Sequence, residues 1–328
     1  MPNYEIYAIG AALVDTEVEI ADSFLVEHSI EKGVMTLVEQ SRQAQLIESL
    51  NQKGSQLLRQ SGGSACNSVV AAAQLGANAY FGGKVANDAD GKLYADDLTQ
   101  AGVSHSFSPT NQGVTGKCLV MVTSDAERTM NTYLGVSDEF AETEINQSAL
   151  AKSEWFYVEG YLQTDDHRTT VVKSAVEFAK QQGVKIGLSL SDPFVAQLFS
   201  GNLKSVIGDG VDLIFCNKDE ALAFTGTNTL DQAAEGLKSY AKAFVITDGA
   251  KGASVFDGES LSRVAGVKAK AVDTNGAGDM FAGTFLYAIT SGKSYQKAAE
   301  LANQAAAMVV ERFGPRLDKA DFASLEIN

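Results

Sequence analysis

Apolar and polar positions along the chain follow two periods, whose alternation predicts a layered α/β fold. Short continuous apolar runs, typical of buried strands, alternate with longer amphipathic segments typical of helices. The predicted strands are residues 4–9, 79–85, 154–158, 185–190, 212–215 and 243–247. The predicted helices are residues 40–51, 66–75, 92–101, 169–181, 219–225, 230–240 and 280–290. Because buried strands separated by helices favour parallel pairing, we expect an α/β fold with a doubly wound, mostly parallel sheet flanked by helices.

Two stretches break this pattern. Residues 14–21 alternate polar and apolar positions, and residues 117–123 and 129–134 form two strands around a polar turn. Such alternation is typical of half-exposed antiparallel strands. We therefore expect a small β lid of residues 11–38 and 105–135, beside a core of residues 1–10, 39–104 and 136–328. A plain edge hairpin is the simpler alternative.

Composition and charge narrow the range of partners. A formal net charge of −15 disfavours nucleic-acid backbones and anionic membranes as partners. The three cysteines lie far apart without a Cys-x-x-Cys spacing, which argues against a zinc cluster or a disulfide framework. No basic leader precedes the first predicted strand and no apolar stretch is long enough to span a bilayer, so we expect a cytoplasmic protein.

A small-residue run, DTNGAGD at residues 273–279, leads directly into the helix predicted at 280–290. Small residues let backbone N–H groups converge on a phosphate, and the helix N-terminus adds partial positive charge. A bound phosphate would repel the carboxylate of Asp279. Asp279 is therefore better suited to face a neutral hydroxyl that loses its proton as phosphate is transferred. The alternative is a glycine turn whose aspartate stabilises the first helical turn.

A second glycine turn opens the helix predicted at 66–75. Gly62 and Gly63 permit close backbone approach, and Asn67 projects an amide from the first helical turn. Polyol hydroxyls are suitable partners for this group. A tight turn with a local capping amide is the alternative.

Together these runs resemble the two signatures of the PfkB/ribokinase family of sugar and nucleoside kinases. The Gly62-Gly63 turn with Asn67 is similar to the first signature, and residues 273–279 are similar to the second, in the family's order. Between them, residues 217–220 (NKDE) resemble the family's Asn-x-x-Glu element, and residues 247–249 (TDG) resemble its nucleotide-loop turn. The resemblance spans nearly the whole chain. It implies a ribokinase-like fold and a kinase that uses ATP and Mg²⁺.

Within the family, the chain most resembles the adenosine kinase branch. Residues 188–194 (LSLSDPF) and 211–217 (VDLIFCN) are similar to that branch, and Ser64 stands where ribokinases typically carry a lysine. Glu159 departs from the small residue usual in adenosine kinases, and a glutamate near a sugar pocket could bind extra hydroxyls. The acceptor thus remains open between a nucleoside and a sugar such as ribose, fructose or a sugar acid.

The resemblance implies roles for individual residues. Asp279 would act as the base, and Asp15 would accept hydrogen bonds from sugar hydroxyls, unless Asp15 is a surface strand residue like Glu17 and Glu19. The expected anion hole comprises Asn275, Gly276, Ala277 and Gly278. Further acceptor contacts are expected at Gly62, Gly63, Asn67, Arg128 and Tyr161. Nucleotide contacts are expected at Asn217, Glu220, Thr247, Gly249, Asn275 and Asn303, with Asn217 and Glu220 holding magnesium through water. Tyr161 and Phe194 are candidates for stacking on a purine, and equally for core packing.

Several points stay open at this level. The helix dipole should lower the pKa of Asp279, which makes orientation of the hydroxyl more important than base strength. The resemblance leaves open a monovalent cation near Asp273. A lid strand can end at solvent or pair with a second subunit, so a monomer and a lid-mediated homodimer are both compatible with the pattern. A catalytically silent nucleoside- or sugar-binding protein is the main competing class. The Gly-x-Gly-x-x-Gly fingerprint of a dinucleotide enzyme does not follow the first strand.

Overall fold

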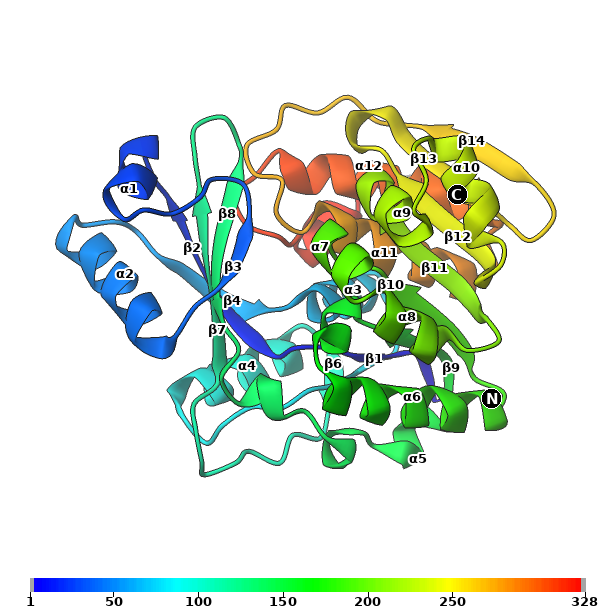
Figure 1. Ribbon diagram of the computed structural model, residues 1–328, viewed down its shortest axis with the longest axis horizontal. Coiled ribbons are helices and arrows are strands. Elements are labelled where there is room, and N and C mark those ends of the chain that lie inside the picture. Colours follow the sequence, from blue (N-terminus) through cyan, green and yellow to red (C-terminus); the bar gives the residue numbers. More distant parts are fainter. Residues whose placement is uncertain (1–2, 326–328) are drawn as a thin grey trace.

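A nine-stranded sheet forms the centre of the molecule in the computed structural model, which describes residues 3–325 (Figure 1). Its order is β14-β13-β12-β11-β10-β9-β1-β5-β6, and all neighbours pair in parallel except β12–β13 and β13–β14. The strands are β1 (Tyr4–Ile9), β5 (Ala79–Gly82), β6 (Val103–His105), β9 (Ser153–Val158), β10 (Lys185–Ser189), β11 (Val211–Asn217), β12 (Ala241–Thr247), β13 (Gly252–Phe256) and β14 (Leu261–Ala265). The predicted doubly wound, mostly parallel sheet is confirmed.

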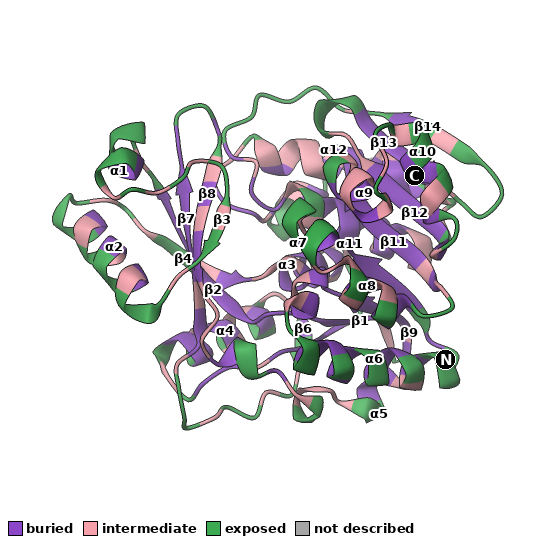
Figure 2. Cartoon of the chain, viewed as in Figure 1, coloured by how far each residue is buried: buried purple, intermediate pink, exposed green. Residues whose placement is uncertain are grey.

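Helices cover both faces of this sheet. One apolar cluster joins it to α3 (Ser64–Leu75), α4 (Ala89–Gln100), α11 (Ala277–Thr290), α12 (Tyr295–Val310) and α13 (Lys319–Phe322). A second cluster joins its other face to α5 (Gln147–Leu150), α6 (Asp166–Gln181), α7 (Pro193–Leu198), α8 (Ser200–Ile207), α9 (Lys218–Thr225) and α10 (Leu230–Leu237). The central strands are buried, whereas the outward faces of the helices are exposed (Figure 2). Within residues 3–325, no helix is long and apolar enough to cross a membrane.

A separate five-stranded sheet stands beside the core, at the left of Figure 1. Its order is β3 (Met35–Leu37), β8 (Arg128–Tyr133), β7 (Gly116–Val122), β2 (Leu13–Glu19) and β4 (Leu58–Gly62). An apolar cluster packs α1 (Asp22–Glu27) and α2 (Gln40–Gln52) on one of its faces. The range 39–104 was expected in the core, but α2 and β4 belong to this smaller sheet.

The smaller sheet also differs from the expected lid of half-exposed, antiparallel strands. Strand β2 pairs in parallel with β7 and antiparallel with β4, and six of its seven residues are buried. The prediction of half-exposure was wrong because helices cover one face of β2 and the core lies against the other. Strands β3, β4, β6, β13 and β14 were not predicted; β3 and β6 have three residues each, and polar residues interrupt the apolar positions of β4 and β14.

Candidate active site

The carboxylate of Asp279 lies in the first turn of α11, where two side chains from α3 hold it. Ser64 donates its hydroxyl to Oδ1 of Asp279 at 2.6 Å, and Asn67 donates its amide to Oδ2 at 3.0 Å. These contacts join residues more than two hundred positions apart, because α3 and α11 pack side by side on the central sheet. The two glycine turns found in the sequence therefore meet at Asp279.

Burial acts on the pKa of Asp279 in the direction opposite to that expected from the helix dipole. Burial raises the pKa of Asp279 above its ordinary value, against the opposing effects of Ser64, Asn67, Arg128 and Arg316. Desolvation is the largest of these effects, since the carboxylate lies between α3 and α11 with limited access to solvent. Asp279 is therefore a stronger base than the sequence alone indicated.

Asp15 lies on β2 and is 5% exposed, although sequence analysis left open an exposed surface position. Its carboxylate accepts no hydrogen bond from the residues that the structure describes. Burial raises the pKa of Asp15 to about 7, with the nearby charges of Asp279 and Glu159 adding to the rise and Arg316 opposing it. A Cβ on Gly62 would lie 2.0 Å from Cγ of Asp15, so only glycine leaves room for this carboxylate.

Asn275 in the small-residue run is buried and binds the smaller sheet. Its Nδ2 donates to Oε1 of Glu17 at 2.7 Å, and its backbone N–H donates to Oδ1 of Asp273 at 2.8 Å. Asp273 also accepts the backbone N–H of Gly314 at 3.1 Å, so both of its carboxylate oxygens brace the loop. The amide of Asn275 is thereby engaged, and the expected cation near Asp273 stays a prediction.

The turn itself leaves open space at one position. Gly276 has φ of 73°, and a Cβ there would lie 2.4 Å from Pro315. In contrast, a Cβ on Gly278 would meet no atom within 4 Å. The backbone N–H of Ala277 donates to the carbonyl oxygen of Thr274 at 3.5 Å, and the N–H groups that follow it at this helix start border an open cradle, which suits an anion such as a phosphoryl group.

Two further contacts connect the smaller sheet to the same loop. Arg128, at the start of β8, donates Nη1 to the carbonyl oxygen of Thr274 at 3.0 Å. The hydroxyl of Thr274 donates to the carbonyl oxygen of Ala126 at 3.3 Å. Arg128 thus lies beside the anion loop, and its approach to phosphates remains a prediction.

Glu159 follows β9 and is fully enclosed. Its Oε1 accepts the backbone N–H of Ala11 at 3.2 Å, and its Oε2 accepts that of Ala65 at 2.8 Å. Burial raises its pKa to about 7. Because each of its oxygens accepts a backbone N–H, this carboxylate holds the β1–β2 connection against the start of α3, and its binding of extra hydroxyls stays a prediction.

Asn217 and Glu220 lie where β11 ends and α9 begins. Asn217 Oδ1 accepts the backbone N–H of Glu220 at 2.9 Å, while Glu220 accepts the backbone N–H and the amide of Asn217 at 3.1 and 2.6 Å. Burial raises the pKa of Glu220 to about 7. No group of three or more His, Cys, Asp or Glu in residues 3–325 could hold a metal ion. These residues fit a magnesium ion that arrives on nucleotide phosphates and keeps its waters.

The remaining predicted residues occupy the carboxyl ends of neighbouring strands or a nearby helix. Thr247 ends β12 beside Asn217 of β11, and Gly249 follows with φ of 51°. Asn303 on α12 donates its amide to the carbonyl oxygen of Ala265 at 3.1 Å. The structure thus brings Asn217 and Thr247 together, whereas the amide of Asn303 is engaged with the backbone.

The two aromatic candidates differ in exposure. The hydroxyl of Tyr161 is 3.3 Å from Oδ2 of Asp192, and its ring packs against the apolar cluster of that face. Phe194 is 52% exposed on α7, and Leu198 on the same helix is 64% exposed. Core packing accounts for Tyr161, and an apolar surface remains available at α7.

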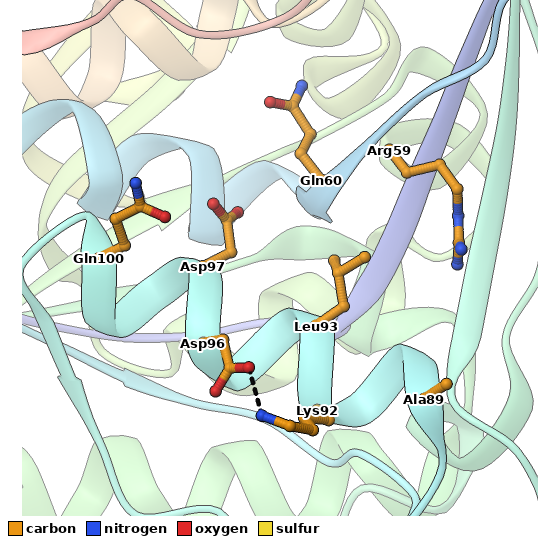
Figure 3. Close-up of a pocket in the computed structure, with 8 residues that line it drawn as sticks. All are labelled: Arg59, Gln60, Ala89, Lys92, Leu93, Asp96, Asp97 and Gln100. Carbon is orange, nitrogen blue, oxygen red and sulfur yellow. Dashed lines mark hydrogen bonds and ion pairs between the residues drawn. The ribbon is translucent and has the colours of Figure 1, made fainter.

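Sequence reasoning missed three members of the site: Ser64, Glu17 and Arg316. Glu17 follows Asp15 by two residues, so strand period alone placed both on one face of β2. Arg316 donates Nε to Oδ1 of Asn67 at 2.9 Å from a C-terminal segment that no motif marked. A groove of about 450 Å³ between α4 and β4 contains none of the predicted site residues (Figure 3).

Known proteins resemble this chain in sequence and in fold. The model of the family described as pfkB family carbohydrate kinase matches residues 34–321. Adenosine kinase from Saccharomyces cerevisiae is 27% identical over 94% of this chain and 95% of its own length. Ribokinase from Haemophilus influenzae is 30% identical over 77% of this chain and 82% of its own.

A solved structure extends the likeness to three dimensions. Adenosine kinase from Sinorhizobium meliloti is 34% identical and superimposes with a TM-score of 0.90, covering 98% of both chains. The fold is therefore ribokinase-like, with the larger and smaller sheets both included. The chain belongs to the PfkB family of carbohydrate kinases, phosphotransferases that use ATP with Mg²⁺ and an alcohol group as acceptor.

Proposed function

We propose that this kinase transfers the γ-phosphate of ATP to a primary hydroxyl on the ribose of a nucleoside. The observation that carries the proposal is the pairing of a buried carboxylate, Asp15, with a partly buried one, Asp279, in different surroundings. Asp279 is held by Ser64 and Asn67 beside the open cradle at Gly278, whereas Asp15 has no donor among the described residues. Asp15 is thus free to accept the hydroxyls of a bound ribose.

In this proposal, Asp279 aims the acceptor hydroxyl and takes its proton. The raised pKa suits that task, because a base works best when its pKa is near the operating pH. Bound Mg²⁺–ATP supplies the phosphoryl group and the metal charge that offsets its negative charge. The backbone N–H groups of residues 276–278 orient that group from the cradle. Glu220 and Asn217, which are hydrogen-bonded to each other, would hold the magnesium ion through water.

The exposed apolar surface of α7 favours a nucleoside over a free sugar. Phe194 and Leu198 lie on a helix at the side of the core that faces the smaller sheet (Figure 1). A purine base offers a large flat surface for such side chains, and a free sugar offers none. The similarity to adenosine kinases along nearly the whole chain supports the same choice.

A free sugar is the second candidate. The ribokinase from Haemophilus influenzae is 30% identical over 77% of this chain, whereas two adenosine kinases are 24% and 25% identical over 96% and 98% of it. Asp15 and the Gly62 turn suit the hydroxyls of ribose whether or not a base is attached.

The smaller sheet is the part that we propose closes over the acceptor. It carries Asp15 on β2 and contacts the anion loop through Glu17 and Arg128. The proposed unit comprises the elements within residues 13–62 and 116–133, and so takes in α2 and β4 in addition to the range expected from the sequence.

A phosphate-acceptor screen tests the proposal. Adenosine, other nucleosides, ribose and fructose are each incubated with Mg²⁺–ATP, and ADP release and the phosphorylated product are measured. We expect the highest kcat/KM with a nucleoside phosphorylated at its 5′ hydroxyl. A higher kcat/KM with ribose or fructose would overturn the nucleoside assignment. A folded protein that binds nucleoside but releases no ADP with any acceptor would identify a silent binding protein.

A further inference from the structure

Arg316 lies in the segment between α12 and α13, and its side chain extends to Asn67 of α3. Its side chain is 10% exposed and donates Nε to Oδ1 of Asn67 at 2.9 Å. Asn67 in turn donates Nδ2 to Oδ2 of Asp279 at 3.0 Å. One amide therefore connects the guanidinium to the carboxylate.

This arrangement determines which way the amide of Asn67 points. The guanidinium has only donors and the Asp279 carboxylate has only acceptors when ionised. A reversed amide would direct its NH₂ toward Arg316 and its oxygen toward Asp279, and both contacts would be repulsive. Arg316 thus selects the one orientation in which Asn67 supports Asp279.

Arg316 is itself fixed by neighbours on both sides. Nη1 pairs with Asp97 of α4 at 3.0 Å, and Nη2 donates to the hydroxyl of Ser61 at 3.0 Å. Asp97 projects from α4 toward β4 beside the groove in Figure 3. The two residues before Arg316 brace the anion loop, since Gly314 binds Asp273 and Pro315 packs against Gly276. The same short segment therefore supports the anion turn and the base.

The charge of Arg316 also acts on the site. The charged groups around Asp279 are Arg128 from β8, Arg316 from the C-terminal segment, Asp15 from β2, and Glu159 and Glu220 from the core. Three carboxyls thus surround Asp279, and two arginines oppose their effect. Of the two arginines, Arg316 is the one that hydrogen-bonds to Asn67, which in turn donates to Asp279.

We propose that Arg316 is a positioning residue for phosphoryl transfer, which orients Asn67 and thereby aims the Asp279 carboxylate at the acceptor hydroxyl. The inference rests on the proposed role of Asp279. Arg316 does not touch substrate; it acts through the amide of Asn67.

Arg316→Met tests the proposal, with Arg312→Met as the matched control. Arg312 lies in the same segment and makes a two-pronged ion pair with Asp321 at 2.6 and 2.8 Å, away from Asp279. The kcat of each variant is measured from pH 5.5 to 9 with the acceptor that gives the highest rate in the screen above. We expect Arg316→Met to lower kcat about ten- to a hundred-fold, as misplacement of a catalytic group does. Its acid limb should move to higher pH, because Asp279 loses a neighbouring positive charge.

The control separates positioning from stability. Arg312→Met should lower the melting temperature and leave kcat and the acid limb unchanged. A kcat within about twofold of wild type in Arg316→Met, or a loss of melting temperature without a shifted acid limb, would overturn the proposal.

Two more variants show whether Arg316 acts through Asn67. After Asn67→Ala, adding Arg316→Met should cost less than about twofold more in kcat, because residues that act as one unit are not additive. Full, multiplicative losses in kcat would contradict the route through Asn67.

Arg316→Lys keeps the positive charge and replaces Arg316→Met as the test variant if the methionine variant does not fold. Its acid limb should match wild type while its kcat falls, because one ammonium group cannot reproduce the guanidinium's contacts with Asn67, Asp97 and Ser61. Wild-type kcat in Arg316→Lys would exclude positioning.

Asp279→Asn distinguishes failure of this inference from failure of the proposed function. If Asp279→Asn keeps full activity, the assignment of the base is wrong, whatever Arg316→Met does. If Asp279→Asn is inactive and Arg316→Met is fully active, only the positioning role is wrong.

Discussion

The carboxylate of Asp279 has a raised pKa and accepts hydrogen bonds from Ser64 and Asn67. In the proposed function, its remaining acceptor positions face the acceptor hydroxyl. We predict that Asp279→Asn lowers kcat at least about 10²-fold, the low end for a positioned acid or base. Its melting temperature should be unchanged or raised at pH 8, because a buried charge is removed. Steady-state kinetics and thermal unfolding check both parts. Retained kcat would remove Asp279 from the chemistry.

Asp15 is the residue whose protonation should control acceptor binding. As pH falls through about 7, its carboxylate becomes protonated and loses acceptor capacity, so the acceptor Kd should rise. Asp15→Ala should weaken acceptor binding at every pH and abolish this trend. Isothermal calorimetry at pH 6 and pH 8 measures both effects. An unchanged Kd would exclude contact with the acceptor.

The same carboxyl makes a prediction for stability. Its folded-state pKa of about 7 lies above its ordinary value of 3.8, so the folded state binds more protons between these pH values. The free energy of unfolding should therefore fall as pH rises through that window. Asp15→Asn removes this penalty, and its melting temperature should exceed that of wild type more at pH 8 than at pH 4. Equal differences at both pH values would contradict the burial of a charge here.

At the scale of elements, β2 is the strand of the smaller sheet that contributes side chains to the candidate site. The side chains of Asp15 and Glu17 lie on one face of β2, and Glu17 accepts a hydrogen bond from the amide of Asn275 in the anion loop. We predict that Glu17→Ala lowers kcat and melting temperature, because the buried amide of Asn275 loses its partner at a cost of about 1–3 kcal/mol. Glu19→Ala is the control, since Glu19 is exposed on the same strand. Equal effects of the two changes would show that Glu17 has no special connection to the loop.

The start of α11 offers a second test at this scale. A Cβ at Gly278 meets no atom within 4 Å, so Gly278→Ala should fold with normal stability. The new methyl group would enter the cradle, and we expect a raised KM for ATP or a lowered kcat. Gly201→Ala on α8 is the control, because it also has no atom within 4 Å. Normal kinetics in Gly278→Ala would place the phosphoryl group elsewhere.

At the scale of the whole molecule, we expect the fold to form without a metal. Residues 3–325 contain no cluster that could hold a metal ion by itself, and the three cysteines are free and buried. We predict that EDTA abolishes phosphoryl transfer and leaves the melting temperature of the nucleotide-free protein unchanged. Differential scanning calorimetry with and without EDTA checks this. A lowered melting temperature would indicate a structural metal.

Much of the architecture could be read from local patterns. The core strands β1, β9, β10, β11 and β12 were found because each is a continuous apolar run, and α6 and α11 because their apolar positions repeat with the helical period. The order of Gly62, Asn67, Asn217 and Asp279 identified the family, because phosphate and hydroxyl binding require particular small and polar residues at turns. These features depend on near neighbours in the chain.

Other features depend on residues far apart in sequence. The burial of Asp15 and Glu17, the raised pKa of Asp279, and the engagement of Glu159 with backbone N–H groups arise only when α3, α11 and the smaller sheet enclose them. Arg316 joins the site through contacts that span about 250 residues. Burial and pairing are properties of the packed molecule, so a local pattern of polar residues cannot distinguish a solvated carboxylate from a desolvated one. The motifs and their order along the chain therefore predict the reaction. The pKa values, the side chains that hold Asp279 and the extent of the smaller sheet follow from tertiary packing.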